Sequence, residues 1–302
     1  MAKVVLLGDT HLGIRKHSDL FANYINKFFD DWFFPFCEKN DIEHVIQLGD
    51  LVDTRKYINS KTLAQLHNNY FGQFEKRKIN LYQMIGNHDV YYKNTNDVNW
   101  IDGVLQNSNY SYIQTFGQPS TVDIDGLPID IIPWINNTNE SDIFKFIKKS
   151  KSKYLCGHLE LAGFELTKGH ESTHGHLAKQ FKKYKKVFTG HYHISSEQGN
   201  ILYTGIPYQL TFADVDDKKG IWIFDTETGE YEFIQYDDRL FNKVIYDDSF
   251  DVKSFDYKSL SNTYVKVVVK EKTDKKLFDA FIIRMQSCNC LLYTSPSPRD
   301  RG

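Results

Sequence analysis

The sequence predicts an α/β fold followed by a smaller α/β appendage. In the first half, short apolar strand patterns alternate with amphipathic helix patterns, which is typical of α/β sheets. The second half is richer in strand patterns, and the alternation restarts after about Asp237. The composition of the 302 residues, 41% hydrophobic and 25% charged, excludes the disordered, collagen-like and disulfide-scaffold classes.

The first half predicts three strands and two helices. Short apolar runs mark the strands, and apolar residues recurring every three or four positions mark one buried face of each helix. A strand–helix–strand succession predicts parallel neighbours with right-handed crossovers. The expected elements are strand 3–7, helix 21–36, strand 44–48, helix 63–74 with its cap at Ser60, and strand 79–85.

The second half predicts a hairpin and further strands. The turn pair Asp125-Gly126 lies between two strand patterns, which is a hairpin signal. The expected elements are strands 121–124 and 129–133, helix 141–150, strands 154–156, 186–189, 201–204, 220–224 and 231–236, and then strand 264–270 and helix 275–286 of the appendage.

The expected organisation is a main domain over residues 1–236 and an incomplete appendage over residues 237–290. The appendage is expected to return to a second strand, but residues 291–302 have no hydrophobic period. They resemble a translated sequencing-adaptor tail, so we predict that they are not native and lie outside the fold.

Charge is distributed unevenly along the chain. The formal net charge of −2 by itself predicts neither a nucleic-acid binder nor a membrane-surface protein. Residues 145–186 nevertheless carry 11 basic and 3 acidic side chains. Solvated helix faces are the commoner explanation of such a run, and contact with phosphates is the alternative.

Targeting signals are absent from the sequence pattern. No apolar run approaches the roughly 20 residues that span a bilayer, and the short run before Gly8 ends too soon for a signal peptide. The four cysteines form no CxxC pair, which favours reduced thiols. We therefore expect a cytoplasmic protein without a membrane partner.

Polar residues follow five of the predicted strands. One such motif is weak evidence, because a lone Asp-x-His or Gly-His is usually an ordinary turn. Five motifs at strand ends supply carboxylate, amide and imidazole donors that suit two divalent cations of the manganese, iron or zinc type. The motifs are Asp9-Thr10-His11, Gly49-Asp50-Leu51-Val52-Asp53, Gly86-Asn87-His88-Asp89, Gly157-His158 and Gly190-His191-Tyr192-His193.

These motifs, together with the sequence Ile132-Pro133-Trp134, resemble those of the calcineurin-like metallophosphoesterases. Among them the chain is most similar to the SbcD-type nuclease subunits of the double-strand-break processing complex, especially those of tailed phages. The resemblance covers approximately residues 3–286. It implies an α+β sandwich of two mixed sheets flanked by helices, with residues 1–236 as the nuclease domain and residues 237–290 as part of a small capping domain.

The resemblance also implies a set of metal ligands around a bridging carboxylate. Two metals about 3.5–4 Å apart need such a bridge to stabilise both the attacking and the departing oxygen of a phosphodiester. Manganese is the expected metal. By matching position, Asp9, His11 and His193 would hold one ion, Asn87, His158 and His191 the other, and Asp50 would bridge them.

Three further positions receive roles from the resemblance. His88 would contact the scissile phosphate and help to protonate or stabilise the leaving 3′ oxygen. Asp89 would orient His88, and a helix N-terminal acid is the alternative for this residue. Asp53 stands where cellular members have a histidine. It would contact the metal ligands without binding the metal itself, and a structural aspartate in a turn is the alternative.

The implied activity is that of a DNA nuclease, with 3′→5′ double-strand exonuclease and single-strand endonuclease action in recombination, repair and replication. The implied partners are DNA, a coiled-coil ABC-type ATPase and a second copy of the chain. The sequence contains no P-loop, so ATP hydrolysis is not expected here. If the chain is phage-encoded, its place would be the host cytoplasm.

Two other functions stay open. A phosphatase or phosphodiesterase on non-DNA substrates could use the same fold. Met84-Ile85 occupies the place of a phosphate-clamping arginine, which argues against this alternative, whereas Arg55 keeps it open. The non-enzymatic alternative is a scaffold that presents DNA ends to the ATPase.

Overall fold

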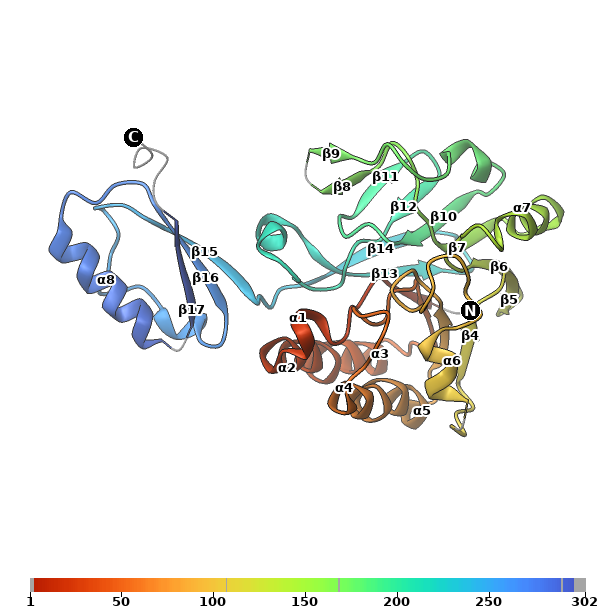
Figure 1. The fold of residues 1–302 in the computed structure, drawn as a ribbon, viewed down its shortest axis with the longest axis horizontal. Helices are drawn as coiled ribbons and strands as arrows, with labels where there is room; N and C mark the ends of the chain where they lie inside the picture. Colours follow the sequence, from red (N-terminus) through yellow and green to blue (C-terminus); the bar gives the residue numbers. More distant parts are fainter. Residues whose placement is uncertain (1–2, 107, 168, 289, 296–302) are drawn as a thin grey trace. The chain divides into compact units, whose positions relative to one another are not determined.

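The computed structural model describes residues 3–106, 108–167, 169–288 and 290–295. The chain divides into two compact units (Figure 1). The first comprises Met1–Tyr208 and Lys218–Tyr236, and the second Gln209–Asp217 and Asp237–Gly302. The second unit therefore includes a short segment from within the range that the sequence assigns to the main domain.

The first sheet of unit 1 has the strand order β14-β13-β1-β2-β3-β4. Strands β1 to β4 pair in parallel, and β13 joins β1 antiparallel. The predicted parallel succession is thereby confirmed, while β4 was not predicted. The strands are β1 (Lys3–Leu7), β2 (His44–Gln47), β3 (Asn80–Met84), β4 (Ile113–Phe116), β13 (Lys219–Asp225) and β14 (Tyr231–Tyr236).

Helical segments connect these strands, and each of the two predicted helices contains a π-helical stretch. The side chain of Asn59 accepts a hydrogen bond from the Thr62 N–H and caps the second helix, so the predicted cap at Ser60 is wrong by one residue. The segments are α1 (Ile14–His17), α2 (Asp19–Lys27), η1 (Phe28–Phe33) and α3 (Phe34–Lys39), then α4 (Ser60–Gln65), η2 (Leu66–Phe71) and α5 (Gly72–Arg77), and α6 (Trp100–Leu105) before β4.

The second sheet of unit 1 has the order β11-β12-β10-β7-β6-β5. Strands β5 and β6 form the predicted hairpin, and β6, β7, β10 and β12 are parallel. The elements are β5 (Ser120–Ile124), β6 (Leu127–Ile132), α7 (Glu140–Lys149), β7 (Tyr154–His158), the hairpin β8 (Glu165–Thr167) and β9 (His170–Glu171), η3 (Ala178–Phe181), β10 (Lys186–Gly190), β11 (Ser196–Gln198) and β12 (Ile201–Tyr203).

The two sheets of unit 1 pack face to face. One buried cluster joins Leu6 and Ile46 of the first sheet to Cys156 and Phe188 of the second. A second cluster covers the other face of the second sheet, where Ile143 of α7 packs on the strands. The expected α+β sandwich of two mixed sheets flanked by helices is confirmed, and Figure 1 shows α2 to α5 beside the first sheet.

Unit 2 is a parallel three-stranded sheet with one helix packed on it. Phe281 and Met285 of α8 are buried against Val265 and Val267. The prediction that the fold ends before Leu291 is wrong, because β17 pairs with β16; residues 296–302 of the predicted tail lie outside the described residues. The elements are η4 (Phe212–Asp216), β15 (Phe241–Tyr246), η5 (Tyr257–Leu260), β16 (Tyr264–Val269), α8 (Lys275–Ser287) and β17 (Leu291–Ser295).

Among the described residues, none of the helices has the length and apolarity needed to cross a bilayer.

Candidate metal centre

The polar motifs of the sequence meet at the carboxyl ends of strands from both sheets of unit 1. Asp9, Asp50 and Asn87 follow β1, β2 and β3, whose parallel pairing brings their ends to one edge. His158 is the last residue of β7, and His191 follows β10, which pairs in parallel with β7. Carboxyl-end edges of α/β sheets are where such sites form.

Asp9, His11 and His193 form one half of the cluster. The Nε2 atoms of His11 and His193 lie 3.0 Å apart, and His193 Nε2 is 4.0 Å from Asp9 Oδ2. Asp9 and His11 are buried, whereas the His193 side chain is 39% exposed. The three side chains offer ligand atoms within 4.8 Å of one another, close enough to hold one metal ion.

Asp50, Asn87, His158 and His191 form the other half. The Asn87 Oδ1 atom is 2.8 Å from both His158 Nε2 and His191 Nδ1. Asp50 Oδ1 is 3.4 Å from His158 Nε2. Asp50, His158 and His191 also offer ligand atoms within 4.8 Å of one another.

Hydrogen bonds and close approaches join the two halves. The His191 N–H donates to both oxygens of Asp9 at 3.1 Å. In addition, the Asp9 Oδ1 atom lies 4.0 Å from the His158 Nδ1 atom. All seven residues that the resemblance assigns as ligands therefore lie in one cluster.

Three cluster residues have backbone angles in the left-handed region. The φ angles are 45° at His11, 51° at Asp50 and 87° at His191. This region costs a residue with a side chain about 1–2 kcal/mol. Strained positions of this kind concentrate at functional sites, and here they turn the chain directly after β1, β2 and β10.

Glycines in the motifs allow close packing around the carboxylates. A Cβ atom on Gly86 would overlap the Asp50 backbone and carboxylate, and one on Gly190 would overlap Asp9. Neither glycine has a positive φ, whereas Gly49 does. Close approach, rather than a sharp turn, is therefore what excludes side chains at Gly86 and Gly190.

Comparison with known proteins shows the family to which this chain belongs. The family model of the calcineurin-like phosphoesterases matches residues 2–195, a span that contains every residue of the cluster. The chain belongs to the calcineurin-like phosphoesterase family. Members of this family use divalent metal ions, and this phosphoesterase is a hydrolase acting on phosphodiester bonds.

Individual proteins also resemble this phosphoesterase. Exonuclease subunit 1 of Enterobacteria phage T4 is 38% identical over 275 residues, which are 91% of this chain and 78% of the phage protein. A solved archaeal phosphodiesterase is 16% identical, with a TM-score of 0.34 over 78% of this chain and 99% of its own. GAP50, the anchor in the inner membrane complex of Plasmodium, is 10% identical, with a TM-score of 0.47 over 79% of this chain and 90% of its own.

The two carboxylates of the phosphoesterase cluster differ in acidity. Burial raises the pKa of Asp9 well above its usual value, and the nearby Asp50 charge adds to this rise. Burial alone would also raise the pKa of Asp50, but the His158 imidazole outweighs it and lowers that pKa. Burial opposes protonation of His158, yet Asp50 raises the pKa of His158 to about 9.

The pKa values of two other imidazoles of the cluster are lowered. Burial lowers the pKa of His11 well below its usual value and that of His191 to about 3. The buried Nδ1 atom of His11 has no hydrogen-bond partner among the residues that the structure describes. Imidazole nitrogens, carboxylate oxygens and an amide oxygen that converge in one site are a donor set that suits a divalent cation. The residues present therefore fit the metal ions of the family.

His88 lies beside the cluster and is fixed by the backbone. Its Nδ1 atom is 2.6 Å from the carbonyl oxygen of Asp53, and its ring centroid is 5.0 Å from that of His11. Because a carbonyl oxygen can only accept, Nδ1 carries the proton and donates it. Nε2 is then the ring nitrogen that can exchange a proton with a substrate.

Asp89 contacts backbone amides and not the side chain of His88. Its carboxylate accepts from the N–H groups of Gly86 at 2.8 Å and Val52 at 3.3 Å. Burial, with the charge of Asp50, raises the pKa of Asp89 to about 7. In the structure, Asp89 therefore joins the loop after β3 to the loop after β2, and the Asp53 carbonyl is the group that orients His88.

Sequence reasoning missed one neighbour of the cluster and left another undecided. The Trp134 ring centroid lies 5.3 Å from that of His191 and 6.0 Å from that of His158. In the sequence, Trp134 was noted only as part of the Ile-Pro-Trp motif.

The Asp53 carboxylate lies 3.7 Å from His11 Nδ1. With His11 and His88 it forms a third group of potential metal-binding atoms.

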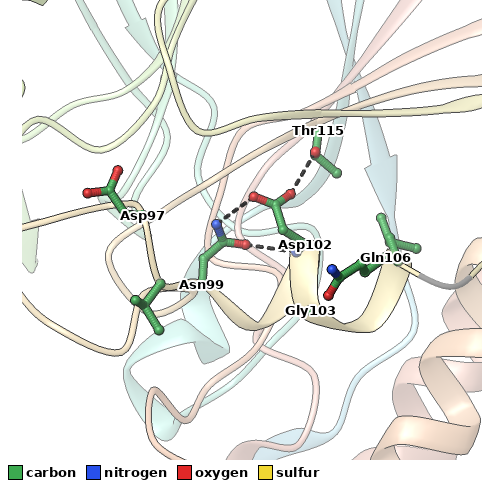
Figure 2. A pocket seen from close by; sticks show the side chains of 8 residues that line it. Asp97, Asn99, Asp102, Gly103, Gln106 and Thr115 are labelled. Atoms are coloured by element: carbon green, nitrogen blue, oxygen red, sulfur yellow. Dashed lines mark hydrogen bonds between the residues drawn. The ribbon is translucent and has the colours of Figure 1, made fainter.

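A separate hollow lies away from this cluster, between α6 and β4 (Figure 2). Its volume is about 600 Å³. Asp102 lies in its wall, where it accepts hydrogen bonds from Asn99 and Thr115. Nothing in its lining is a cluster residue: the lining is Asp97, Val98, Asn99, Asp102, Gly103, Leu105, Gln106 and Thr115.

Proposed function

We propose that this phosphoesterase is a two-metal DNA nuclease, with 3′→5′ double-strand exonuclease and single-strand endonuclease activity in recombination, repair and replication. The observation that carries the proposal is the adjacency of two ligand groups, Asp9–His11–His193 and Asp50–His158–His191, which the His191 N–H joins by donating to Asp9. The 38% identity to a protein named exonuclease subunit 1 supports DNA as the substrate. Manganese is the proposed metal.

Each ligand position has a role in this proposal. Asp9, His11 and His193 would hold one ion, Asn87, His158 and His191 would hold the other, and Asp50 would be shared by both sites. Ions bound there would supply an activated water and neutralise charge on the phosphodiester oxygens. Asp50 is kept in place because one of its oxygens accepts the His88 N–H at 2.7 Å.

His88 handles the leaving oxygen in the proposed reaction. Its Nδ1 proton is donated to the Asp53 carbonyl at 2.6 Å, which leaves Nε2 to face the phosphate. A proton on Nε2 can be given to the departing 3′ oxygen, and positioned groups of this kind contribute about 10²–10⁴-fold to rate.

The lysine-rich segment 145–186 supports a DNA partner. Several of its lysines are used within the fold: Lys183 donates to the Ile147 and Ser150 carbonyls at the end of α7, and Lys186 pairs with Glu197. Others are exposed to solvent, where they could contact a phosphate backbone. The exposed ones include Lys148, Lys149, Lys151, Lys153, Lys182 and Lys185.

The proposed protein partners come from the family resemblance. They are a coiled-coil ABC-type ATPase of the same complex and a second copy of this chain. The phage relative is named as a subunit, which supports an assembly. Gel filtration of the chain alone measures self-association, and gel filtration with a candidate ATPase measures complex formation. A monomer that does not bind the ATPase would contradict this part of the proposal.

A substrate panel tests the proposed activity. Purified protein with Mn²⁺ is expected to release nucleotides from double-stranded DNA, to cut single-stranded circles and to act poorly on nitrophenyl phosphate. The variants Asp50→Asn and His88→Ala are expected to lose DNA hydrolysis. Fast hydrolysis of the small ester without DNA cleavage would instead establish a phosphatase, and DNA binding without hydrolysis would establish a scaffold.

A further inference from the structure

Trp134 packs against the histidines of one half of the ligand cluster. Its half-buried ring is inclined by 40° to the His191 ring at a centroid distance of 5.3 Å, and by 67° to the His158 ring at 6.0 Å. No ring contact joins Trp134 to His11 or His193 among the described residues. The tryptophan therefore forms a wall behind the two imidazoles whose ring nitrogens converge on Asn87.

Three buried asparagines hold the backbone of Trp134. Its carbonyl oxygen accepts from the side-chain amides of Asn96 and Asn139, each at 2.9 Å. Asn136 completes the group by donating to Asn96 Oδ1 at 3.0 Å. On the other side, the Trp134 N–H donates to the Ile85 carbonyl at 2.9 Å.

This network has the character of a positioning device. All three asparagines are at most 8% exposed, and a hydrogen-bonded network of buried polar side chains makes the segments that it joins more rigid. The network joins the loop after β6, which carries Trp134, to the loop after β3, which carries Asn87 and His88. The ring that contacts His158 and His191 is thus fixed to the same loop as the amide that they share.

Each half of the cluster has one histidine that is not fully buried, His193 in one and His191 in the other. His158 is fully buried and its Nδ1 is 2.7 Å from the Leu48 carbonyl. The Trp134 ring packs against both histidines of the second half.

The geometry points to Trp134 as a positioning residue that sets the metal affinity of the Asn87–His158–His191 half and leaves the Asp9–His11–His193 half unchanged. This inference rests on the proposed two-metal function. An imidazole that binds a cation becomes more positive at its edge, and the face of an indole ring attracts such an edge. Packing also restricts the two imidazoles to the rotamers in which their nitrogens converge.

Manganese titration of the whole chain by calorimetry tests the inference. Wild-type protein is expected to show two binding events. In Trp134→Leu one event is expected to weaken by about tenfold or more, as when other groups behind metal ligands are removed, while the second stays the same. Trp134→Phe keeps an aromatic face and is expected to restore the lost affinity.

Two further readouts guard against a simple folding defect. Asn139→Ala removes one of the two hydrogen bonds to the Trp134 carbonyl without touching the ring, and it is expected to weaken the same event more mildly. Indole fluorescence reports the location: bound Mn²⁺ is expected to quench emission in wild type and in the matched control Trp222→Phe, but much less in Trp134→Phe. Thermal melting checks that each variant is folded.

The outcomes separate this inference from the proposed function. If wild-type protein binds no metal, both fail. If wild-type protein binds two ions and Trp134→Leu binds both equally well, only the inference fails. Equal weakening of both events in folded Trp134→Leu would also overturn it, because the residue would then support the cluster as a whole. If Trp134→Leu does not fold, unchanged binding by Asn139→Ala decides against the inference.

Discussion

The Nδ1 atom of His88 lies 2.6 Å from the main-chain carbonyl oxygen of Asp53. A main-chain group, which no side-chain substitution removes, therefore fixes the ring of the proposed proton donor. His88 reaches the cluster a second time through its own N–H, which donates to Asp50 Oδ1 at 2.7 Å. Its backbone supports the proposed bridging carboxylate, while its side chain is left for the substrate.

Replacing His88 by alanine should separate chemistry from metal binding. The backbone N–H that holds Asp50 remains in His88→Ala, so we expect two ions to bind as before. The rate of DNA hydrolysis should fall about 10²–10⁴-fold because the proton donor is lost. Calorimetry and single-turnover cleavage measure the two effects, and an active His88→Ala variant would remove this step of the mechanism.

Asp89→Ala should act on stability. It leaves the buried amides of Gly86 and Val52 without their acceptor, which should lower the free energy of unfolding by about 1–3 kcal/mol. Asp89→Asn keeps one acceptor oxygen and should lose less. Urea unfolding measures the change. A stable Asp89→Ala protein with the rate loss of His88→Ala would show that Asp89 acts on His88 after all.

The left-handed backbone at His191 predicts an inverted order of stability. With a φ of 87°, a Cβ atom at this position is strained, so His191→Gly should be more stable than His191→Ala by about 1 kcal/mol. Both variants should lose one metal site. Unfolding is measured in chelator, and an alanine variant more stable than the glycine variant would contradict the strain.

The exposed lysines after α7 predict a salt-dependent contact with DNA. Reversing two of them in Lys151→Glu/Lys153→Glu should weaken binding and lower the slope of log affinity against log salt by about 2. The control Lys253→Glu/Lys258→Glu makes the same charge change in unit 2, on lysines that are also exposed. Filter binding over a salt range measures both, and equal losses would mean that only net charge matters.

The ligand cluster could be predicted from the sequence because each of its residues stands at, or a few residues after, the end of an apolar strand. Parallel pairing then brings Asp9, Asp50 and Asn87 to one edge without any knowledge of side-chain contacts. The roles of Asp89 and Asp53 could not be predicted in this way. Which group contacts the His88 ring depends on loop geometry. In the structure, this group is the main-chain carbonyl of Asp53 and not a carboxylate.

Other features were beyond the sequence for similar reasons. Trp134 is distant from the histidines along the chain, so only the folded sheet shows its contact with His191. The π-helical stretches keep the apolar period of an ordinary helix and were not distinguished from one. Strand β17 (Leu291–Ser295) lies in a segment without hydrophobic period, and its pairing with β16 depends on the register of the neighbouring strand.

The central claim is that two metal ions held around Asp50 carry out DNA hydrolysis. The most direct measurement counts manganese per chain in wild type and in Asp50→Asn while the same samples are assayed for nucleotide release from double-stranded DNA. The account predicts two ions and release of nucleotides for wild type, with loss of an ion and of activity together in Asp50→Asn. Full nuclease activity in Asp50→Asn, or in wild-type protein stripped of metal, would contradict it.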